Sequence, residues 1–243
     1  MDPLTSLAAS GIRARMESLD LLANNVANAS TGGYKADREF YNLYVAPEAG
    51  DNPTLTTMPV IDKPWTDFSQ GVVQPTGNPL DVALNGKGFF TVQSPRGALY
   101  TRSGNFQLAG DGRLVTADGY PVLGNGGTTL TLNGSRPIEI SSNGTVSQDG
   151  TVIGQLQVVD FTSVGSLSKQ GNNYFRTAGP SVQPAPSGAQ VQQGRLEASN
   201  SGTADAAVRL VSIMRQFEML QKAMTLGSDM SKQAIEQVAR VGS

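Results

Sequence analysis

The chain has 243 residues, with 18 Lys and Arg against 20 Asp and Glu and a net charge of −2. This length allows one large domain or two small ones, and the balanced charge disfavours a nucleic-acid-binding protein, which would carry a basic face. The chain contains no Cys and no His, which excludes disulfides, Cys nucleophiles, His-based triads and thiolate or imidazole metal sites.

An amphipathic helix is predicted from about residue 3 to residue 27. Asp2 and Pro3 suit its start, because a carboxylate accepts from free N–H groups and Pro lacks the N–H that would stay unpaired. An acid at this place is unlike a secretory signal, so no cleaved signal peptide is expected. The Asn- and Gly-rich stretch 24–33 is typical of a helix end. Apolar residues at helical spacing form one face: Leu4, Leu7, Ile12, Met16, Leu19, Leu22 and Val26.

The middle of the chain predicts a β-rich domain between two irregular segments. Residues 34–45 are amphipathic but ambiguous, and the Pro-containing stretch 46–64 is expected to be an extended linker. From 65 to 178, short apolar runs alternate with Asn-Gly and Asp-Gly pairs, the dipeptides of tight hairpin turns, so an antiparallel β domain is expected. The Pro/Ser/Gln-rich stretch 179–200 is expected to be a connector.

A second amphipathic helix is predicted in the last segment, 201–243. Its length and single apolar stripe favour a coiled coil, and a helix lying on the β domain is the alternative. No run approaches the roughly 18 apolar residues of a membrane-spanning helix. The fold class is therefore α+β, with terminal helices pairing as a coiled-coil-like core and a central antiparallel β domain. The stripe includes Leu210, Met214, Phe217, Leu220, Met224 and Met230.

Catalytic motifs are not recognisable. The Gly-rich stretches 86–88 and 124–127 lie among predicted strands and lack the strand–loop–helix context of a phosphate loop, so hairpin turns explain them. Carboxylate pairs occur in any chain with 20 acids, and nothing distinguishes one pair. We expect no enzyme activity, no cofactor, no metal and no small-molecule substrate.

Three segments resemble signatures of the bacterial flagellar rod and hook protein family. The first is LLANNVANASTGGYKADREF at 21–40, and the second comprises PLDVALNGKGFFTV at 79–92 with YTRSGNFQLAGDGRLVTADGYPVLG at 100–124. The third comprises QGRLEASNSG at 193–202 and RQFEMLQKAM at 215–224. The order of the segments is that of the family. Within the family, the opening Met1-Asp2, the 119–124 segment, the 215–219 run and the modest length favour the proximal-rod branch over the distal-rod branch.

The resemblance implies an axial structural subunit. Residues 1–45 would form an axial helix and motif and 201–243 the second axial helix, with the 65–178 domain outside. It implies a place in the rod of the basal body where it spans the periplasm, and export by the flagellar type III apparatus without a cleaved signal. The implied partners are other rod subunits and copies of the same chain.

Twelve residues are predicted to contact neighbouring subunits. Those of the apolar stripes follow from the need of each stripe for a partner helix, and those of the Asn-rich segment follow from the family resemblance. An adhesin-like β-domain binding module and a carboxylate hydrolase are the alternatives from other classes of protein. The contact candidates are Leu19, Leu22, Asn24, Asn25, Val26, Asn28, Tyr34, Leu210, Met214, Phe217, Leu220 and Met224.

Overall fold

The computed structural model describes residues 3–39, 41–45, 57–61, 64–179 and 183–241, and the chain forms two compact units. The helical unit comprises 1–27, 37–66 and 202–243, and the β unit comprises 28–36 and 67–201. Helices and antiparallel strand pairs together confirm the predicted α+β class.

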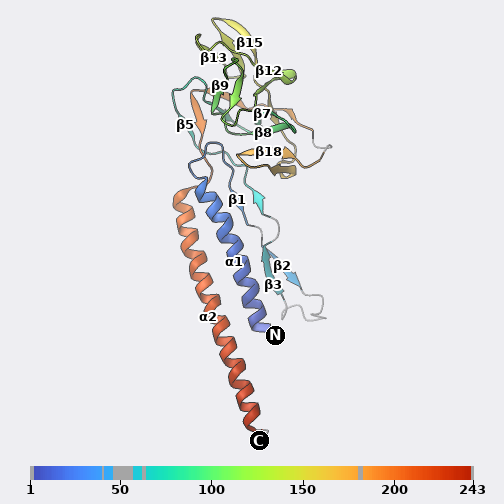
Figure 1. Cartoon of the computed structure of the whole chain (residues 1–243), viewed down its shortest axis with the longest axis vertical. Coiled ribbons are helices and arrows are strands. Elements are labelled where there is room, and N and C mark those ends of the chain that lie inside the picture. The colour runs from blue at the N-terminus through green and yellow to red at the C-terminus, as the bar shows by residue number, and fades with distance from the viewer. Residues whose placement is uncertain (1–2, 40, 46–56, 62–63, 180–182, 242–243) are drawn as a thin grey trace. The chain divides into compact units, whose positions relative to one another are not determined.

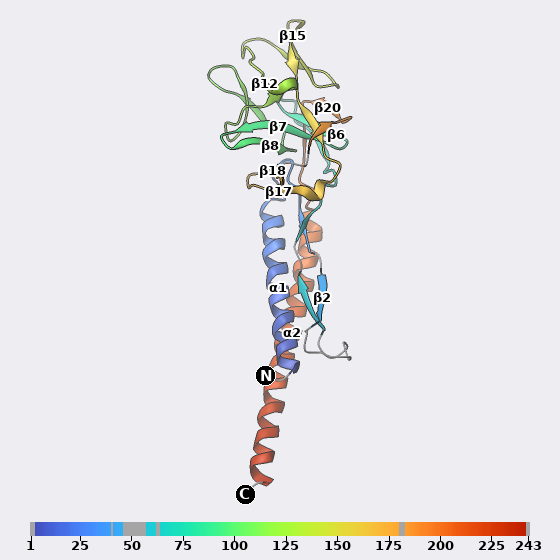
Figure 2. The same ribbon diagram turned by 90° about the vertical axis from the view of Figure 1, so that its right-hand side faces the viewer.

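Two long helices dominate the helical unit and lie side by side in both views (Figures 1 and 2). α1 (Pro3–Ala27) has the predicted bounds, and α2 (Thr203–Val241) runs for 39 residues. Leu22 packs against Ile213, whereas Gly11 lies against Leu220. Later positions of α1 thus meet earlier positions of α2, so the two helices are antiparallel.

Short strands complete the helical unit. β1 (Asp37–Arg38) pairs with β4 (Trp65–Thr66), and β2 (Tyr41–Val45) pairs with β3 (Thr57–Ile61), all antiparallel. The stretch 46–64, predicted as an extended linker, therefore contains β3, because each residue of Thr57–Ile61 has a partner in β2. Residues 46–56 and 62–63 of that stretch lie outside the described residues.

The β unit is built around a sheet of six strands, in the part of the chain that the structure describes. Phe89 and Tyr100 belong to a mainly aromatic cluster on one face of the sheet. Their chain neighbours Phe90 and Leu99 belong to a larger, mostly aliphatic cluster on the other face. Both sheet faces are therefore buried. In order, the strands are β17 (Leu167–Lys169), β18 (Tyr174–Thr177), β8 (Gly97–Thr101), β7 (Phe89–Ser94), β16 (Val158–Asp160) and β19 (Ala185–Pro186).

Smaller antiparallel groups surround this sheet. The turn at Asp149-Gly150 has positive φ at both residues, 49° and 76°, as a type I′ hairpin requires. It joins two strands of a three-stranded sheet: β13 (Ile138–Ile140), β14 (Thr145–Gln148) and β15 (Thr151–Gln155). The remaining pairs are β5 (Val73–Pro75) with β21 (Arg195–Glu197), β6 (Val82–Asn85) with β20 (Gln190–Gln193), β9 (Phe106–Leu108) with β10 (Leu114–Thr116), and β11 (Leu123–Gly124) with β12 (Thr128–Thr129). In the part of the chain that the structure describes, 3₁₀ turns occupy Asn125–Gly127 and Val164–Ser166.

The stretch 179–200, predicted as a connector, instead contributes three strands, β19, β20 and β21. Its composition is polar, but Val191 of β20 is buried in the aliphatic cluster, and β20 and β21 each complete a ladder with a strand near the start of the β unit. Backbone pairing, rather than side-chain hydrophobicity, makes these residues part of the sheet structure.

Candidate functional site: a buried ionic junction

The segment that follows α1 packs against the rest of the β unit. We call residues 28–36 the junction loop. It begins with a turn in which Thr31 N donates to Asn28 O at 3.1 Å. Gly33 then adopts φ of 69°, and a Cβ there would collide with the backbone of Arg102 and Ser103. Only glycine lets the loop lie this close to the strand end.

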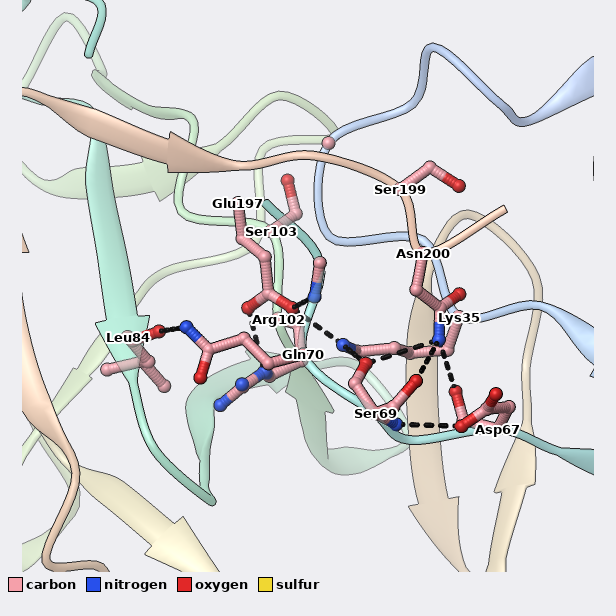
Figure 3. Close-up of polar contacts among 12 residues, drawn as sticks. Lys35, Asp67, Ser69, Gln70, Leu84, Arg102, Ser103, Glu197, Ser199 and Asn200 are labelled. Atoms are coloured by element: carbon pink, nitrogen blue, oxygen red, sulfur yellow. Dashed lines mark hydrogen bonds and ion pairs between the residues drawn. The ribbon is translucent and has the colours of Figure 1, made fainter. Parts of the chain in front are cut away.

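Three charged side chains meet beneath the junction loop (Figure 3). Lys35 Nζ donates to Glu197 Oε1 at 2.6 Å, and Arg102 Nε lies 3.0 Å from Glu197 Oε2. The side chains of Lys35 and Glu197 are 0% exposed and that of Arg102 is 4% exposed. Such burial is rare for charged residues unless they are paired. The three residues come from segments far apart in the sequence, so this ionic junction ties the chain together.

Backbone groups bind further atoms of the three charged side chains. Arg102 Nη1 donates to Gly86 O at 2.9 Å and to Gly88 O at 2.7 Å, and Lys35 Nζ donates to Ser69 O at 2.6 Å. Gly71 N donates to Glu197 Oε1 at 2.9 Å. Each cation therefore contacts both the carboxylate and carbonyl oxygens, which offset part of the desolvation cost.

The electrostatic balance at the junction depends on Glu197. Burial lowers the pKa of the Lys35 ammonium and that of the Arg102 guanidinium, and the carboxylate of Glu197 opposes this lowering in both. Asp67 acts in the same direction on Lys35, and Asp160 does so on Arg102, each more weakly than Glu197. Glu197 is thus the main counter-ion of two buried cations.

Asn200 holds the backbone on both sides of the junction (Figure 3). Its Oδ1 accepts from Ala36 N at 2.7 Å, and its Nδ2 donates to Asp67 O at 2.7 Å. A direct backbone bond, from Asp67 N to Ala36 O at 2.8 Å, runs alongside. One amide side chain therefore hydrogen-bonds to the backbones of two chain segments at once, through its oxygen to one and its nitrogen to the other.

The hairpin formed by β17 and β18 holds the other side of the junction loop. Lys169 Nζ donates to Lys35 O at 2.6 Å and lies 4.6 Å from the ring centroid of Tyr34. Asn173 Nδ2 donates to Gly32 O at 3.2 Å. Asn173 has a positive φ of 62°, a conformation that non-glycine residues rarely adopt. The loop is thus shaped to reach the junction loop.

A second amide clamp lies within the helical unit. Asn25 Nδ2 donates to Asp37 O at 2.7 Å, and Asn25 Oδ1 accepts from Asp37 N at 3.0 Å. Thr66 Oγ1 donates to the carboxylate of Asp37 at 2.8 Å. Asn25 therefore fixes β1 against the end of α1 through two parallel hydrogen bonds.

The predicted contact residues of the N-terminal segment fall into two groups. Leu22, Asn25 and Tyr34 are buried against their own chain, and Leu19 packs at the edge of the Leu22 cluster. Asn24 and Val26 are exposed, whereas Asn28 is half-buried. The sequence marks the internal roles of Asn25 and Tyr34 only by position: Asn25 lies in the last turn of the amphipathic helix and Tyr34 lies seven residues after its end.

The predicted contact residues of α2 also divide by exposure. Leu210 and Met214 are exposed, at 41% and 52%. Phe217, Leu220 and Met224 are half-buried, and Leu220 lies against α1. The predicted stripe thus extends from the α1 contact onto solvent-facing helix surface.

The ionic junction itself was not predicted from the sequence. Lys35 and Glu197 both occur in the quoted signature segments, but neither has a local pattern that distinguishes a buried charge from a solvated one. The burial extends to the chain neighbours of Lys35, since Tyr34 and Ala36 are both buried in the structure. Among the described residues there is no cluster of three or more His, Cys, Asp or Glu side chains suited to a metal, and no helix is long and apolar enough to cross a membrane. The groups of the junction bind one another, so the arrangement is suited to holding chain segments together.

Profiles of known families match three parts of the chain. One described as a flagella basal body rod protein matches residues 7–35, and one described as the flagellar hook protein FlgE/F/G D1 domain matches 83–154. A third, the flagellar basal body rod FlgEFG protein C-terminal region, matches 192–237. The first and third matches contain Lys35 and Glu197, and the second contains Arg102.

Curated relatives match over nearly the whole chain. The flagellar basal-body rod protein FlgF of Caulobacter vibrioides is 33% identical over 228 residues, covering 92% of each protein. FlgG of Bacillus subtilis is 32% identical over 254 residues, covering 93% of this chain and 95% of the relative. FlgF of Rhizobium meliloti is 30% identical over 236 residues, covering 95% of each.

Proposed function

The chain belongs to the flagellar basal-body rod protein family and is a structural subunit of that rod, and we propose that it occupies the proximal position. The alignment lengths support this position. FlgF of C. vibrioides needs 228 aligned positions to cover 92% of the chain, whereas FlgG of B. subtilis needs 254 to cover 93%. Residues present in that FlgG relative are therefore absent here, which favours the proximal branch over the distal branch.

We propose that α1 and α2 form a coiled-coil-like pair in the axial core of the rod. Ala206, Ile213 and Leu220 recur every seven residues along α2, the spacing of one coiled-coil seam. Ala206 and Ile213 are buried with Leu22 of α1, and Leu220 meets Gly11. Absence of a side chain at Gly11 allows the helices to approach closely, because a Cβ there would already lie 3.2 Å from Leu220.

A second apolar face of α2 supports contact with another rod subunit. Val208 and Met219 are 72% and 62% exposed, and a groove of about 610 Å³ runs between them. Gln216 lines this groove, and its buried Oε1 has no hydrogen-bond partner among the described residues. A solvent-facing apolar stripe with an unsatisfied amide is suited to a partner helix that carries a donor. The groove is lined by Ala207, Val208, Val211, Ser212, Arg215, Gln216 and Met219.

The twelve predicted contact residues take different parts in this proposal. Leu210 and Met214, which are exposed, would pack against a neighbouring subunit, as would Val26 and Asn24 of α1. Contacts between one surface and a different surface of the next copy build an open helical filament when the rotation between copies does not close into a ring. Such a filament is the geometry that a rod requires, and other rod subunits would continue it at each end.

The family resemblance also supports the route and place proposed for the chain. We propose export through the flagellar type III apparatus without a cleaved signal, and a position in the part of the rod that spans the periplasm. The relatives are named as flagellar basal-body rod proteins, which supports a role in torque transmission rather than catalysis.

Counting subunits in purified basal bodies tests the proximal position. Quantitative mass spectrometry would measure this chain against the hook subunit and the other rod subunits. A few copies, fewer than the distal rod subunit, are expected. Many copies would assign the chain to the distal rod, and complete absence from intact basal bodies would overturn a rod function.

A further inference from the structure

The junction loop is held mainly by residues near the other end of the β unit. Gly33 N donates to Glu197 O at 2.7 Å, and Ala36 N donates to Asn200 Oδ1 at 2.7 Å. Asn200 N donates to Tyr34 O at 3.3 Å. The loop's backbone groups make these hydrogen bonds only when the segment 197–200 is in place. That segment is distant in the sequence, since 162 positions separate Lys35 from Glu197.

The ionic junction makes this dependence stronger than hydrogen bonding alone. When the loop docks, the ammonium of Lys35 enters a site that already holds the guanidinium of Arg102, which is fixed by Gly86 O and Gly88 O. With Glu197 present, one carboxylate contacts both cations. Without it, two buried cations would face each other with only the weaker influence of Asp67 and Asp160, and an uncompensated buried charge is strongly destabilising.

We infer that Glu197 acts as an electrostatic latch, so that the junction loop docks onto the β unit only after the last strand, β21, has taken its place. The loop directly follows α1, and β21 leads within six residues to α2, which starts at Thr203. The latch therefore makes the anchoring of one terminal segment conditional on the other. This inference concerns the isolated chain, and it does not rest on the proposed position in the rod.

Hydrogen–deuterium exchange of the full chain tests the latch. Glu197→Gln keeps the size of the side chain but removes its charge, and amide exchange in residues 31–36 should become about tenfold faster or more. Amides of the central strand β7 serve as the internal reference. Glu139→Gln, an exposed substitution of the same chemistry in the β unit, is the matched control and should leave exchange in the loop unchanged.

Removing one of the two buried cations distinguishes the electrostatic latch from simple packing. Lys35→Met removes one of the two cations, so the double variant K35M/E197Q should exchange its loop amides more slowly than E197Q alone. This comparison also stands if E197Q fails to fold, because the double variant should then fold where the single variant does not. Loop exchange in E197Q equal to that in E139Q would overturn the inference, as would a double variant less protected than E197Q.

Discussion

Lys35 Nζ and Glu197 Oε1 lie 2.6 Å apart although 162 positions separate the two residues in the chain. Both are completely buried, and both belong to segments that match rod-protein profiles. The two terminal segments that match the profiles are therefore joined inside a single subunit by this buried ion pair. The signature that begins in the Asn-rich segment thus has an internal role beside any role between subunits.

Replacing Gly33 by Ala should release the junction loop. The residue has φ of 69°, which costs a non-glycine residue about 1–2 kcal/mol, and the new Cβ would also collide with the backbone of Ser103. We expect a loss of stability of about 2–4 kcal/mol in urea unfolding, together with rapid proteolysis in the loop.

Gly77→Ala separates the two causes of that loss. Gly77 has a similar φ of 75°, but a Cβ there would have nothing within 4 Å. It should therefore show only the conformational cost of about 1–2 kcal/mol. Equal losses in the two variants would mean that the close approach of the loop to Ser103 contributes nothing.

Gly104→Ala should destabilise the β unit without any effect of backbone conformation. Its φ is not in the left-handed region, but a Cβ would overlap the carbonyl oxygen of Val82 and press on the ring of Phe90. Overpacking of this kind costs about 1–3 kcal/mol. Gly110→Ala, at an open position, is the control, and thermal unfolding of both variants is the measurement. A Gly104 variant as stable as the Gly110 variant would contradict the packing seen here.

The elements of the fold that carry a periodic pattern were predictable from the sequence. α1 has the expected bounds because its stripe repeats at helical spacing, and the Asp149-Gly150 turn occurs where the dipeptide indicates it. β20 and β21 were missed because their residues are mostly polar: their ladders use backbone groups, which every residue carries. Local composition does not reveal such pairing.

The junction was missed for a different reason. A charged residue is usually solvated, so Lys35, Arg102 and Glu197 suggest surface positions when each is considered alone. Their burial depends on three distant segments meeting at one point, and no local pattern encodes that meeting. The helix pairing was foreseeable from the stripes, but the residues that join the segments after α1 and before α2 required the three-dimensional structure.

Ionisation of the buried phenol of Tyr174 is expected to lower the stability of the protein at alkaline pH. Burial raises the pKa of its phenol above the usual value, as does the hydrogen bond to Asp118, which accepts at 2.8 Å. A raised pKa in the folded state means that the unfolded chain releases this proton first, so the stabilisation is complete below the ordinary tyrosine pKa of about 10 and is lost as pH rises above it.

Comparison of wild type with Tyr174→Phe tests this dependence. The variant should be less stable near neutral pH, by about 0.5–1.5 kcal/mol for the lost hydrogen bonds to Asp118 and Thr116. Its stability should fall less steeply than that of the wild type above about pH 10. Denaturant unfolding at a series of pH values gives both quantities, and parallel curves for the two proteins would rule out a contribution from Tyr174.

Met214→Asp should block assembly while leaving the subunit folded. Met214 is 52% exposed on α2, so a carboxylate there meets water in the free chain and costs little. In an assembled rod the same carboxylate would be buried against a neighbouring helix without a partner, at a cost of several kcal/mol. We expect wild-type circular dichroism and unfolding of the isolated variant, but no incorporation into basal bodies and no motility.

Two further variants make the Met214 result specific. Met214→Leu keeps an apolar side chain of similar size and should assemble normally. Phe217→Asp, at a half-buried position, should block incorporation too and also weaken the isolated helical unit. Because the predicted stripe includes residues on both the α1 contact and the exposed face of α2, only an exposed position can separate folding from assembly. Normal incorporation of Met214→Asp would therefore remove this face of α2 from the subunit interface and leave the axial contacts to other residues of the helices.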